Sequence, residues 1–200
     1  MKSDSIRIAN CSGFYGDKLS VARDMIEGGP IDVLTGDYLA ELTMTILYNQ
    51  KLKRGEQHGY VGTFLKQFRD VAKLAQEKNK KIVTNAGGLN PSSMANSVKE
   101  IIDELNLDLK VAHIEGDDLM PRIDELYQGG EKLTNIDKSL DLQNYKKKPI
   151  TANAYLGAWG IKEALDNGAD VVICPRVTDA AVVIGPAAVS YTHLRAHETV

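Results

Sequence analysis

The chain has 200 residues, of which 43% are hydrophobic and 26% are charged, so its composition is that of a globular protein long enough to bury a core. Its formal net charge is only -3, which gives no general reason to expect nucleic-acid binding, because nucleic-acid-binding proteins usually carry a basic surface. The composition predicts one globular domain without a nucleic-acid partner.

The N-terminal residues and the cysteines predict a cytoplasmic protein. No window contains the roughly 18 uncharged apolar residues that a membrane span needs, and the first residues lack the apolar region of a secretory signal. Cys11 and Cys174 are too few for a disulfide scaffold and are not spaced like metal ligands. We therefore expect a reducing compartment and no membrane partner.

Short apolar runs alternate with helical patterns along the chain. Asn90-Pro91 is a typical helix start, with Asn90 as the N-cap and Pro91 at the first helical position. Residues 131–149 show no sustained period, which predicts a surface excursion or a small hairpin. Strands are predicted at residues 5–10, 31–34, 81–84, 109–114, 150–154 and 170–175. Helices are predicted from Asp17 to about residue 27, and at residues 38–53, 61–75, 91–105, 119–127 and 158–167.

This alternation predicts an α/β protein with a mostly parallel sheet. The strands are rich in β-branched residues, which is typical of sheets that helices cover on both faces, as in Rossmann-like folds. Right-handed crossovers place the carboxyl ends of all strands at one edge, where open α/β sheets bind ligands. The pattern stops abruptly near residue 189, so we expect the fold to be incomplete at its C-terminus.

Residues 190–200, SYTHLRAHETV, differ in character from the rest of the chain. They show no regular spacing of apolar residues, and they resemble translated adapter sequence. We predict that residues 1–189 are a truncated α/β domain and that the remainder is a non-native tail. His193 and His197 are not arranged in the HExxH order of zinc proteases, so no zinc site is predicted there.

Polar side chains follow nearly every predicted strand. For any single residue, a role in capping a helix or forming a turn is the simpler explanation, but convergence at one edge favours a shared binding cleft. The predicted acid/base residues are Asp37, Asp117 and Asp179. The predicted substrate-binding residues are Ser12, Tyr15, Asn85, Gly87, Gly88, Asn90, Asn153, Arg176 and Thr178.

Several of these residues have a predicted chemical role. Asn85, Gly87 and Gly88 would bind an anionic or carbonyl group, and Arg176 would pair with a carboxylate or phosphate. Neither a dinucleotide fingerprint nor a P-loop is present, so the sequence identifies no cofactor. The carboxylates leave Mg²⁺ as an alternative, although their spacing alone does not make them a metal site and no metal ligand is assigned.

A cysteine nucleophile is disfavoured. Cys11 follows the first strand near a helix start, where a thiolate would be stabilised, but it needs a histidine partner. His58 and His113 are the histidines outside the tail, and His113 is predicted to be a core residue within strand 109–114. Cys174 is predicted to be an ordinary core residue.

Six sequence segments, in this order along the chain, closely resemble segments of a known family: RIANCSGFYGD, GGPIDVLTGDYLAELTM, KIVTNAGGLNP, EGDD, ANAYLGAWGI and RVTDAAVVIGPAA. Together they resemble the N-terminal domain of the acyclic terpene utilisation family, once described as a domain of unknown function. The resemblance covers nearly everything from Ile6 to Ala188. The family domain is considerably longer than this chain, and no catalytic residue set is carried over from it.

The resemblance implies a part in the bacterial breakdown of acyclic terpenes such as citronellol and geraniol, whose intermediates are branched acyl-CoA thioesters. We therefore expect a fragment of an enzyme that acts on a small-molecule substrate of this kind; an oligomer is compatible with the sequence. Two alternatives stay open: a non-catalytic acyl-CoA-binding or scaffolding protein, and a truncated chain without function.

Overall fold

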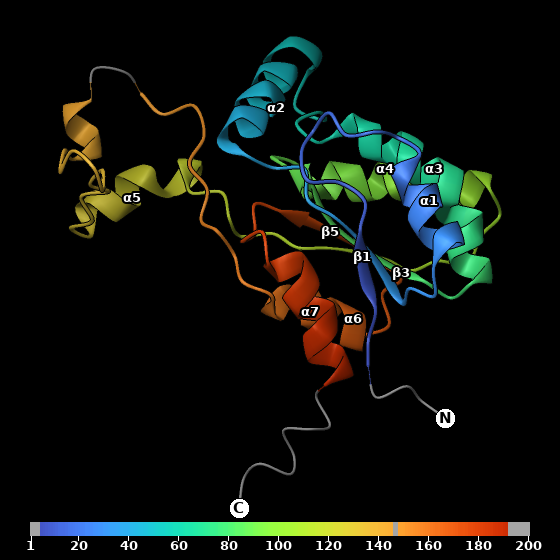
Figure 1. Ribbon diagram of the computed structural model, residues 1–200. Helices are drawn as coiled ribbons and strands as arrows, with labels where there is room; N and C mark the ends of the chain where they lie inside the picture. Colours follow the sequence, from blue (N-terminus) through green and yellow to red (C-terminus); the bar gives the residue numbers. More distant parts are fainter. Residues whose placement is uncertain (1–4, 146–147, 192–200) are drawn as a thin grey trace, which may run out of the picture.

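The computed structural model describes residues 5–145 and 148–191 (Figure 1). The strands are β1 (Ile8–Asn10), β2 (Val33–Gly36), β3 (Lys81–Gly88), β4 (Val111–His113) and β5 (Val171–Pro175). The α-helices are α1 (Val21–Gly28), α2 (Glu41–Arg54), α3 (Gly62–Glu77), α4 (Pro91–Glu104), α5 (Ile123–Gln128), α6 (Trp159–Asp166) and α7 (Ala181–Ser190). Two 3-10 turns, η1 (Met120–Arg122) and η2 (Leu142–Asn144), complete the elements.

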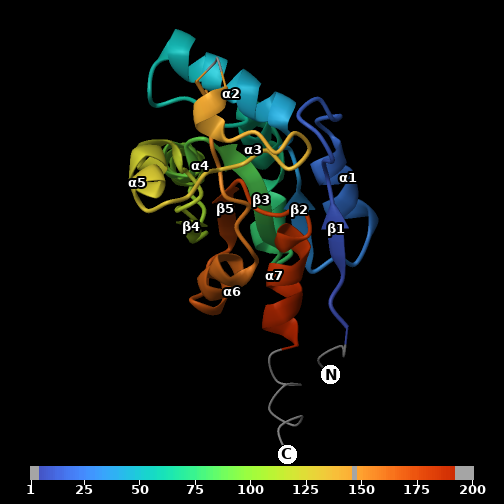
Figure 2. The same ribbon diagram turned by 90° about the vertical axis from the view of Figure 1, so that its left-hand side faces the viewer.

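The strands form one parallel sheet in the order β1-β2-β3-β5-β4. Figure 2 shows them side by side in this order. The predicted α/β class with a parallel sheet is thereby confirmed. The two outermost strands have only three residues each, which limits the exposed edges to which another strand could pair.

Alternate residues of the central strands pack into two hydrophobic cores, one on each face of the sheet. On one face, Leu34, Ile82 and Ile173 pack with side chains from α1, α3 and α4. On the other face, Val33 and Val172 pack with residues of α6 and α7. Figure 1 shows the two helical layers on opposite sides of the strands. Burial on both faces explains why these strands are almost continuously apolar.

The neighbouring strands β3 and β5 are followed by helices on opposite faces. After β3 the chain turns into α4, on the face of the first core, whereas after β5 it turns into α7 on the other face. A parallel sheet opens a crevice at such a switch point, beyond the carboxyl ends of the two strands. Residues near the carboxyl ends of β2, β3 and β5 therefore lie where such a crevice is expected.

The strand predicted at residues 150–154 does not exist, and this prediction was wrong. Because β5 pairs with β3 on one side and β4 on the other, no place beside it is left for a further strand. The segment instead crosses the carboxyl edge. It makes isolated bridges through Asn153 to Asp118 and through Leu156 to Val177.

Two local predictions also need correction. The first helix begins at Val21 and not at Asp17, because the Asp17 carboxylate accepts hydrogen bonds from the backbone N–H groups of Gly13 (2.6 Å) and Phe14 (3.3 Å) and so holds a turn before the helix. His113 is not a core residue. It ends the edge strand β4, its side chain is 38% exposed, and its Nε2 lies 3.1 Å from Glu115 Oε1.

The chain between β4 and α6 includes a projecting segment that we call the lobe, described at residues 119–145 and 148–149. It contains η1, α5 and η2, and Figure 1 shows it standing away from the helices and sheet of the main body. The described part of residues 131–149 contains no strand and is folded back by backbone hydrogen bonds such as Asn135 N to Leu140 O (2.9 Å). The predicted irregular excursion is confirmed. His193 and His197, in the segment predicted to be a non-native tail, lie outside the described residues.

Candidate functional site

Asp37 and Asn85 are joined at the carboxyl edge of β2 and β3. Asn85 follows Thr84, the last residue of β3 that pairs with β2, and its side chain is completely buried. Its Oδ1 accepts a hydrogen bond from Tyr38 N (2.8 Å), while its Nδ2 donates to Asp37 Oδ1 (2.5 Å). The first bond fixes which way the amide faces, so Asn85 presents a donor to the Asp37 carboxylate.

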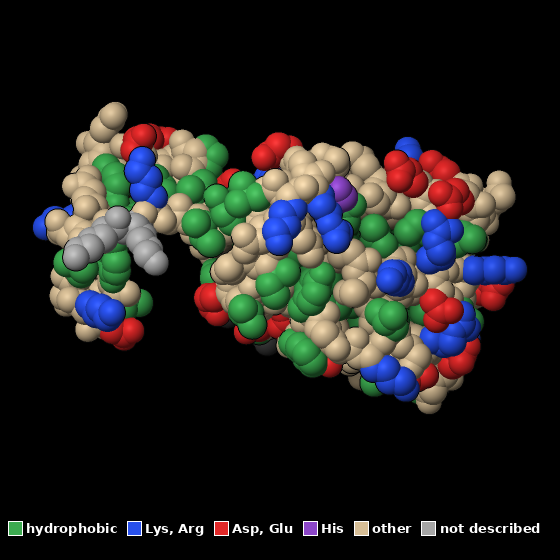
Figure 3. Space-filling model, turned by 90° about the horizontal axis from the view of Figure 1, so that it is seen from above, with side chains coloured by type: hydrophobic (Ala, Val, Ile, Leu, Met, Phe, Trp, Pro, Cys, Tyr) green, Lys and Arg blue, Asp and Glu red, His purple; other side chains and the backbone are tan. Residues whose placement is uncertain are grey.

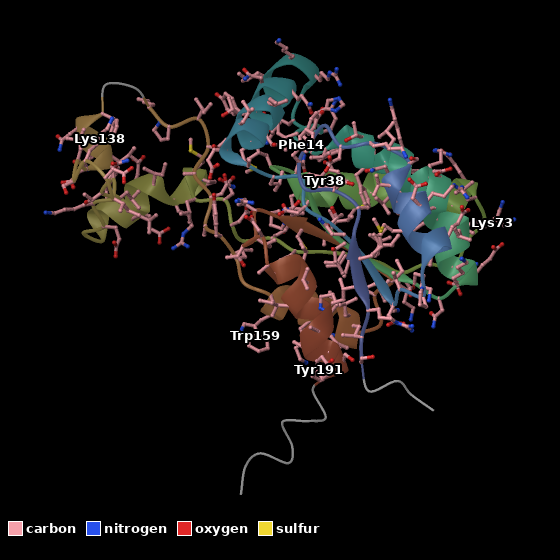
Figure 4. The ribbon with its side chains drawn as sticks, in the orientation of Figure 1. Phe14, Tyr38, Lys73, Lys138, Trp159 and Tyr191 are labelled. Atoms are coloured by element: carbon pink, nitrogen blue, oxygen red, sulfur yellow. The ribbon has the colours of Figure 1, made fainter. Side chains whose placement is uncertain are left out.

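The backbone on both sides of Asp37 is anchored. Asp37 N donates to the carbonyl oxygen of Ser12 (2.9 Å), which ties the loop after β2 to the loop after β1. The next residue, Tyr38, is buried against Phe64 in an edge-to-face contact, and its hydroxyl donates to Gln67 Oε1 (2.5 Å). Figure 4 shows Tyr38 inside the main body. Asp37 is thus held on a rigid support.

Arg176 follows β5 and lies beside this pair. Its Nη1 donates to the carbonyl oxygen of Leu39 (3.1 Å) and to Asp179 Oδ1 (3.0 Å). Its guanidinium carbon is 4.0 Å from the centre of the Tyr155 ring, an arrangement that gives a cation–π attraction. The Arg176 side chain is buried, whereas the Asp179 side chain is 68% exposed, so the ion pair opens towards solvent.

Tyr155 extends the cluster to the start of α2. Its hydroxyl donates to Glu41 Oε1 (2.6 Å), and this bond together with the stacking on Arg176 fixes the segment that crosses the sheet edge. Glu41 was not among the residues predicted from the sequence to form the site. Glu41 lies four residues after Asp37 at a helix start, and this spacing of two carboxylates was the signal available for Glu41.

The environment shifts the acidity of the carboxyl groups in different directions. Burial raises the pKa of Asp37, and the negative charge of Asp179 raises it further, while the Asn85 hydrogen bond and the charge of Arg176 oppose the shift. The hydrogen bond from Tyr155 lowers the pKa of the exposed Glu41 carboxyl. Two carboxyl groups near one arginine therefore differ in their readiness to hold a proton, which is a pattern seen at acid/base sites.

Asp117 is a buried link between three segments. Its Oδ2 accepts hydrogen bonds from Asn153 Nδ2 (2.8 Å) and from Arg176 N (3.2 Å), and its backbone oxygen accepts from Ala154 N (2.7 Å). Burial raises the pKa of its carboxyl group, against the effect of these hydrogen bonds. Asp117 and Asn153 are thus brought together beside Arg176, in positions where they hold the backbone.

The glycines at the end of β3 are required by packing. A methyl group at Gly87 would lie 2.5 Å from the carbonyl oxygen of Cys174, and one at Gly88 would overlap the Leu47 side chain. Gly88 also has a φ of 54°, in the left-handed region that favours glycine. Both residues are buried. Their contact with a ligand stays a prediction, because close packing alone explains why glycine is needed at both positions.

The remaining predicted site residues have partners near their own loops. Asn90 is the N-cap of α4: its Oδ1 accepts from Ser93 N (3.1 Å) and its Nδ2 donates to Glu56 O (2.8 Å). Ser12 Oγ donates to Phe14 O (2.8 Å), and the Tyr15 hydroxyl accepts from Gln50 Nε2 (3.1 Å). Thr178 is exposed, and its backbone N–H donates to Leu156 O (2.9 Å).

Over the part of the chain that the structure describes, no three His, Cys, Asp or Glu side chains gather closely enough to hold a metal ion. Cys174 is buried in the core as predicted, and burial raises the pKa of its thiol. Cys11 is also buried, and its Sγ lies 3.9 Å from the Tyr38 hydroxyl.

Comparison with known proteins identifies the family. Residues 6–195 match the family described as acyclic terpene utilisation family protein AtuA. The chain belongs to this family. This match confirms the resemblance to the acyclic terpene utilisation family that the six sequence segments indicated. Those segments include the residues around Asp37, Asn85, Asp117 and Arg176. No curated protein and no solved structure matches the chain. Among the described residues, no helix combines the length and the apolar character needed to cross a membrane.

Proposed function

We propose that the chain belongs to an enzyme that acts on acyclic terpenes or related branched acyl-CoA compounds, with its active site around Asp37, Asn85 and Arg176. The observation that carries this proposal is the half-buried Asp37 carboxyl, whose pKa is raised beside a fixed amide donor and an arginine–aspartate pair. Polar groups of this kind at the switch point of a parallel sheet are typical of a catalytic centre.

In this proposal Asp37 is the acid/base residue. A raised pKa brings a carboxyl group closer to the pH at which the protein works, so that it can both hold and release a proton. Asn85 keeps the carboxyl oxygen in one orientation, and the more exposed Asp179 is the second acid/base candidate. Asp117 acts through its hydrogen bonds to Asn153 and Arg176 N as a positioning residue.

The charge of the cluster favours an uncharged reacting group. Arg176 already pairs with Asp179 and a backbone carbonyl, and the neighbouring Asp37 and Glu41 add negative charge. A phosphate would be repelled by these carboxylates, whereas a carbonyl or hydroxyl group could accept or donate hydrogen bonds. The thioester carbonyl or a hydroxyl of the substrate would therefore lie here, with any phosphate elsewhere.

The experiment is a turnover and thermal-shift screen of this chain against branched acyl-CoA thioesters, with and without Mg²⁺. Asp37→Asn is the test variant, and Asp32→Asn is its control because Asp32 precedes the same strand at the opposite edge. We expect Asp37→Asn to lose turnover while both variants stay folded. Equal turnover in the three proteins would refute the assignment, and binding without turnover in all of them would favour the non-catalytic alternative.

A further inference from the structure

The lobe carries an open cavity of about 500 Å³ that is separate from the candidate site. Apolar atoms of Ile123, Tyr127, Leu142 and Tyr145 form much of its wall, and Asp124 and Lys148 line it as charged residues. This volume lies within the roughly 300–1,000 Å³ of small-molecule sites, which are also mostly apolar with a few polar groups. The cavity is therefore large enough for a ligand.

The lobe lacks the buried core that would normally hold such a segment together. None of its described residues reaches the burial of the two sheet cores, although several apolar side chains turn partly inward. Ordering a segment of this length has a large cost in conformational entropy, which burial of apolar surface must offset. An apolar ligand in the cavity would supply the missing contacts of Ile123, Leu142 and Tyr145.

The charged groups at the cavity favour an anionic head on that ligand. Lys148 is exposed and makes no ion pair or hydrogen bond with another described residue. Asp124 is in the first turn of α5, where the helix N-terminus already compensates a carboxylate. The Tyr127 hydroxyl is buried and has no hydrogen-bond partner among the described residues. An exposed lysine beside an apolar wall suits a carboxylate with a hydrocarbon chain.

We propose that this cavity binds an amphipathic carboxylate, with the hydrocarbon chain among Ile123, Leu142 and Tyr145 and the carboxylate at Lys148. The inference does not depend on the reaction proposed above, because it rests on the lobe alone. Figure 3, seen from above, shows the lobe separated by a hollow from the main body, with hydrophobic side chains on it. Met120 lines both this cavity and a smaller one of about 190 Å³ towards α2, which Asp118 also lines. A bound chain would thus lie on the side of the lobe that leads to the sheet edge.

The test compares three probes with the same hydrocarbon chain: octanoate, octanol and octylamine. Their affinities for the whole chain are measured by calorimetry, without any assay of turnover. Octanoate should bind best and octylamine least well. Lys148→Met should weaken octanoate by roughly twofold to fivefold, as for a partly exposed ion pair, and leave octanol unchanged.

Two further variants separate the cavity from general adhesion to the lobe. Gln143 is exposed and lines the cavity, so Gln143→Trp should narrow it and weaken binding of all three probes. Ile136 is in the same lobe but is 97% exposed and is not part of the wall, so Ile136→Asp should bind as the parent does. Circular dichroism checks that each variant is folded.

Each part of the proposal can be overturned by a different binding result. Octylamine binding as tightly as octanoate would overturn the role of Lys148, and unchanged binding by Gln143→Trp would overturn the cavity as the site. An equal loss in Ile136→Asp would mean that the probes only adhere to exposed apolar surface. If Gln143→Trp disturbs folding, the comparison of Lys148→Met with the parent still decides the proposal, because Lys148 is exposed.

Discussion

The guanidinium of Arg176 stacks on the ring of Tyr155, 4.0 Å from its centre, and so joins the end of β5 to the segment that crosses the sheet edge. The Tyr155 hydroxyl continues the connection to Glu41 at the start of α2. One tyrosine thus holds two elements that are distant in the sequence. This relationship leads to the first of four predictions.

Removing the Tyr155 ring should have a larger effect than removing its hydroxyl. Tyr155→Ala should lower the free energy of unfolding by about 1 kcal/mol, from the lost cation–π contact and hydrogen bond. Tyr155→Phe keeps the ring, so its effect should be smaller, but the pKa of Glu41 should rise because its main stabilising bond is gone. Urea unfolding measures the first effect and carboxyl NMR titration the second. An unchanged Glu41 titration in Tyr155→Phe would contradict the hydrogen bond.

The stability contributed by Asp37 should fall as the pH rises. Because its pKa is raised by folding, the folded state binds its proton more tightly than the unfolded chain, whose carboxyl titrates near about 3.9. The contribution is complete below that pH and is lost as the pH rises through the folded pKa. Asp37→Asn, which stays neutral, should therefore become more stable relative to the parent over that rise.

Asp32 gives the opposite sign and is the control for this measurement. Burial would raise its pKa, but hydrogen bonds from Arg7 N and Nε outweigh that effect and lower it. Its contribution is present above the unfolded pKa and is lost as the pH falls through the folded value. Asp32→Asn should therefore lose stability relative to the parent as the pH rises. Urea unfolding over a pH series should give slopes of opposite sign for the two variants; equal slopes would be inconsistent with the Asp37 environment.

Gly87→Ala should destabilise the protein by about 1–3 kcal/mol, the cost of overpacking a tight interior. The added methyl group would press against the Cys174 carbonyl oxygen and against Pro91, which belong to backbone that cannot easily move. Gly62→Ala is the control, because nothing lies within 4 Å of a methyl group at this position in α3. Its stability should be unchanged or slightly higher. Thermal unfolding distinguishes the two, and equal stability of both would contradict the close packing.

Both thiols should be nearly unreactive in the folded protein. Cys11 and Cys174 are buried, and burial raises the pKa of each thiol, so little thiolate is present or accessible. A colourimetric thiol reagent should react slowly in buffer and quickly in denaturant. Rapid reaction of Cys11 in the folded state would contradict this prediction and would support Cys11 as a nucleophile.

The local chemistry of the fold was predictable because single segments encode it. Asn90-Pro91 specified the start of α4, and the capping bond to Ser93 N is present in the structure. The buried central strands could be recognised from their β-branched residues alone. The segment at residues 150–154 was misread because its pattern is that of a strand, and only the pairing of β5 on both sides excludes it from the sheet.

The site was predictable in part for a similar reason. Asp37 and Arg176 follow β2 and β5, and Asn85 lies in β3 directly after its last pair with β2, so the parallel topology places all three near one edge. The partnership of Tyr155 with Glu41 joins residues 114 positions apart, and no local pattern contains it. The packing need for Gly87 and Gly88 likewise depends on Cys174 and Leu47, which come from other elements.

The lobe leaves and rejoins the main body at one point. Asp118 and Asn153 form an antiparallel bridge, and Leu119 N donates to Ala152 O (2.8 Å), so the two ends of the excursion are held side by side. The strand order is therefore independent of the length and content of the chain between them. Residues between the two ends could therefore be replaced without changing the sheet, so the proposed cavity in the lobe and the proposed site at the sheet edge could vary independently of each other.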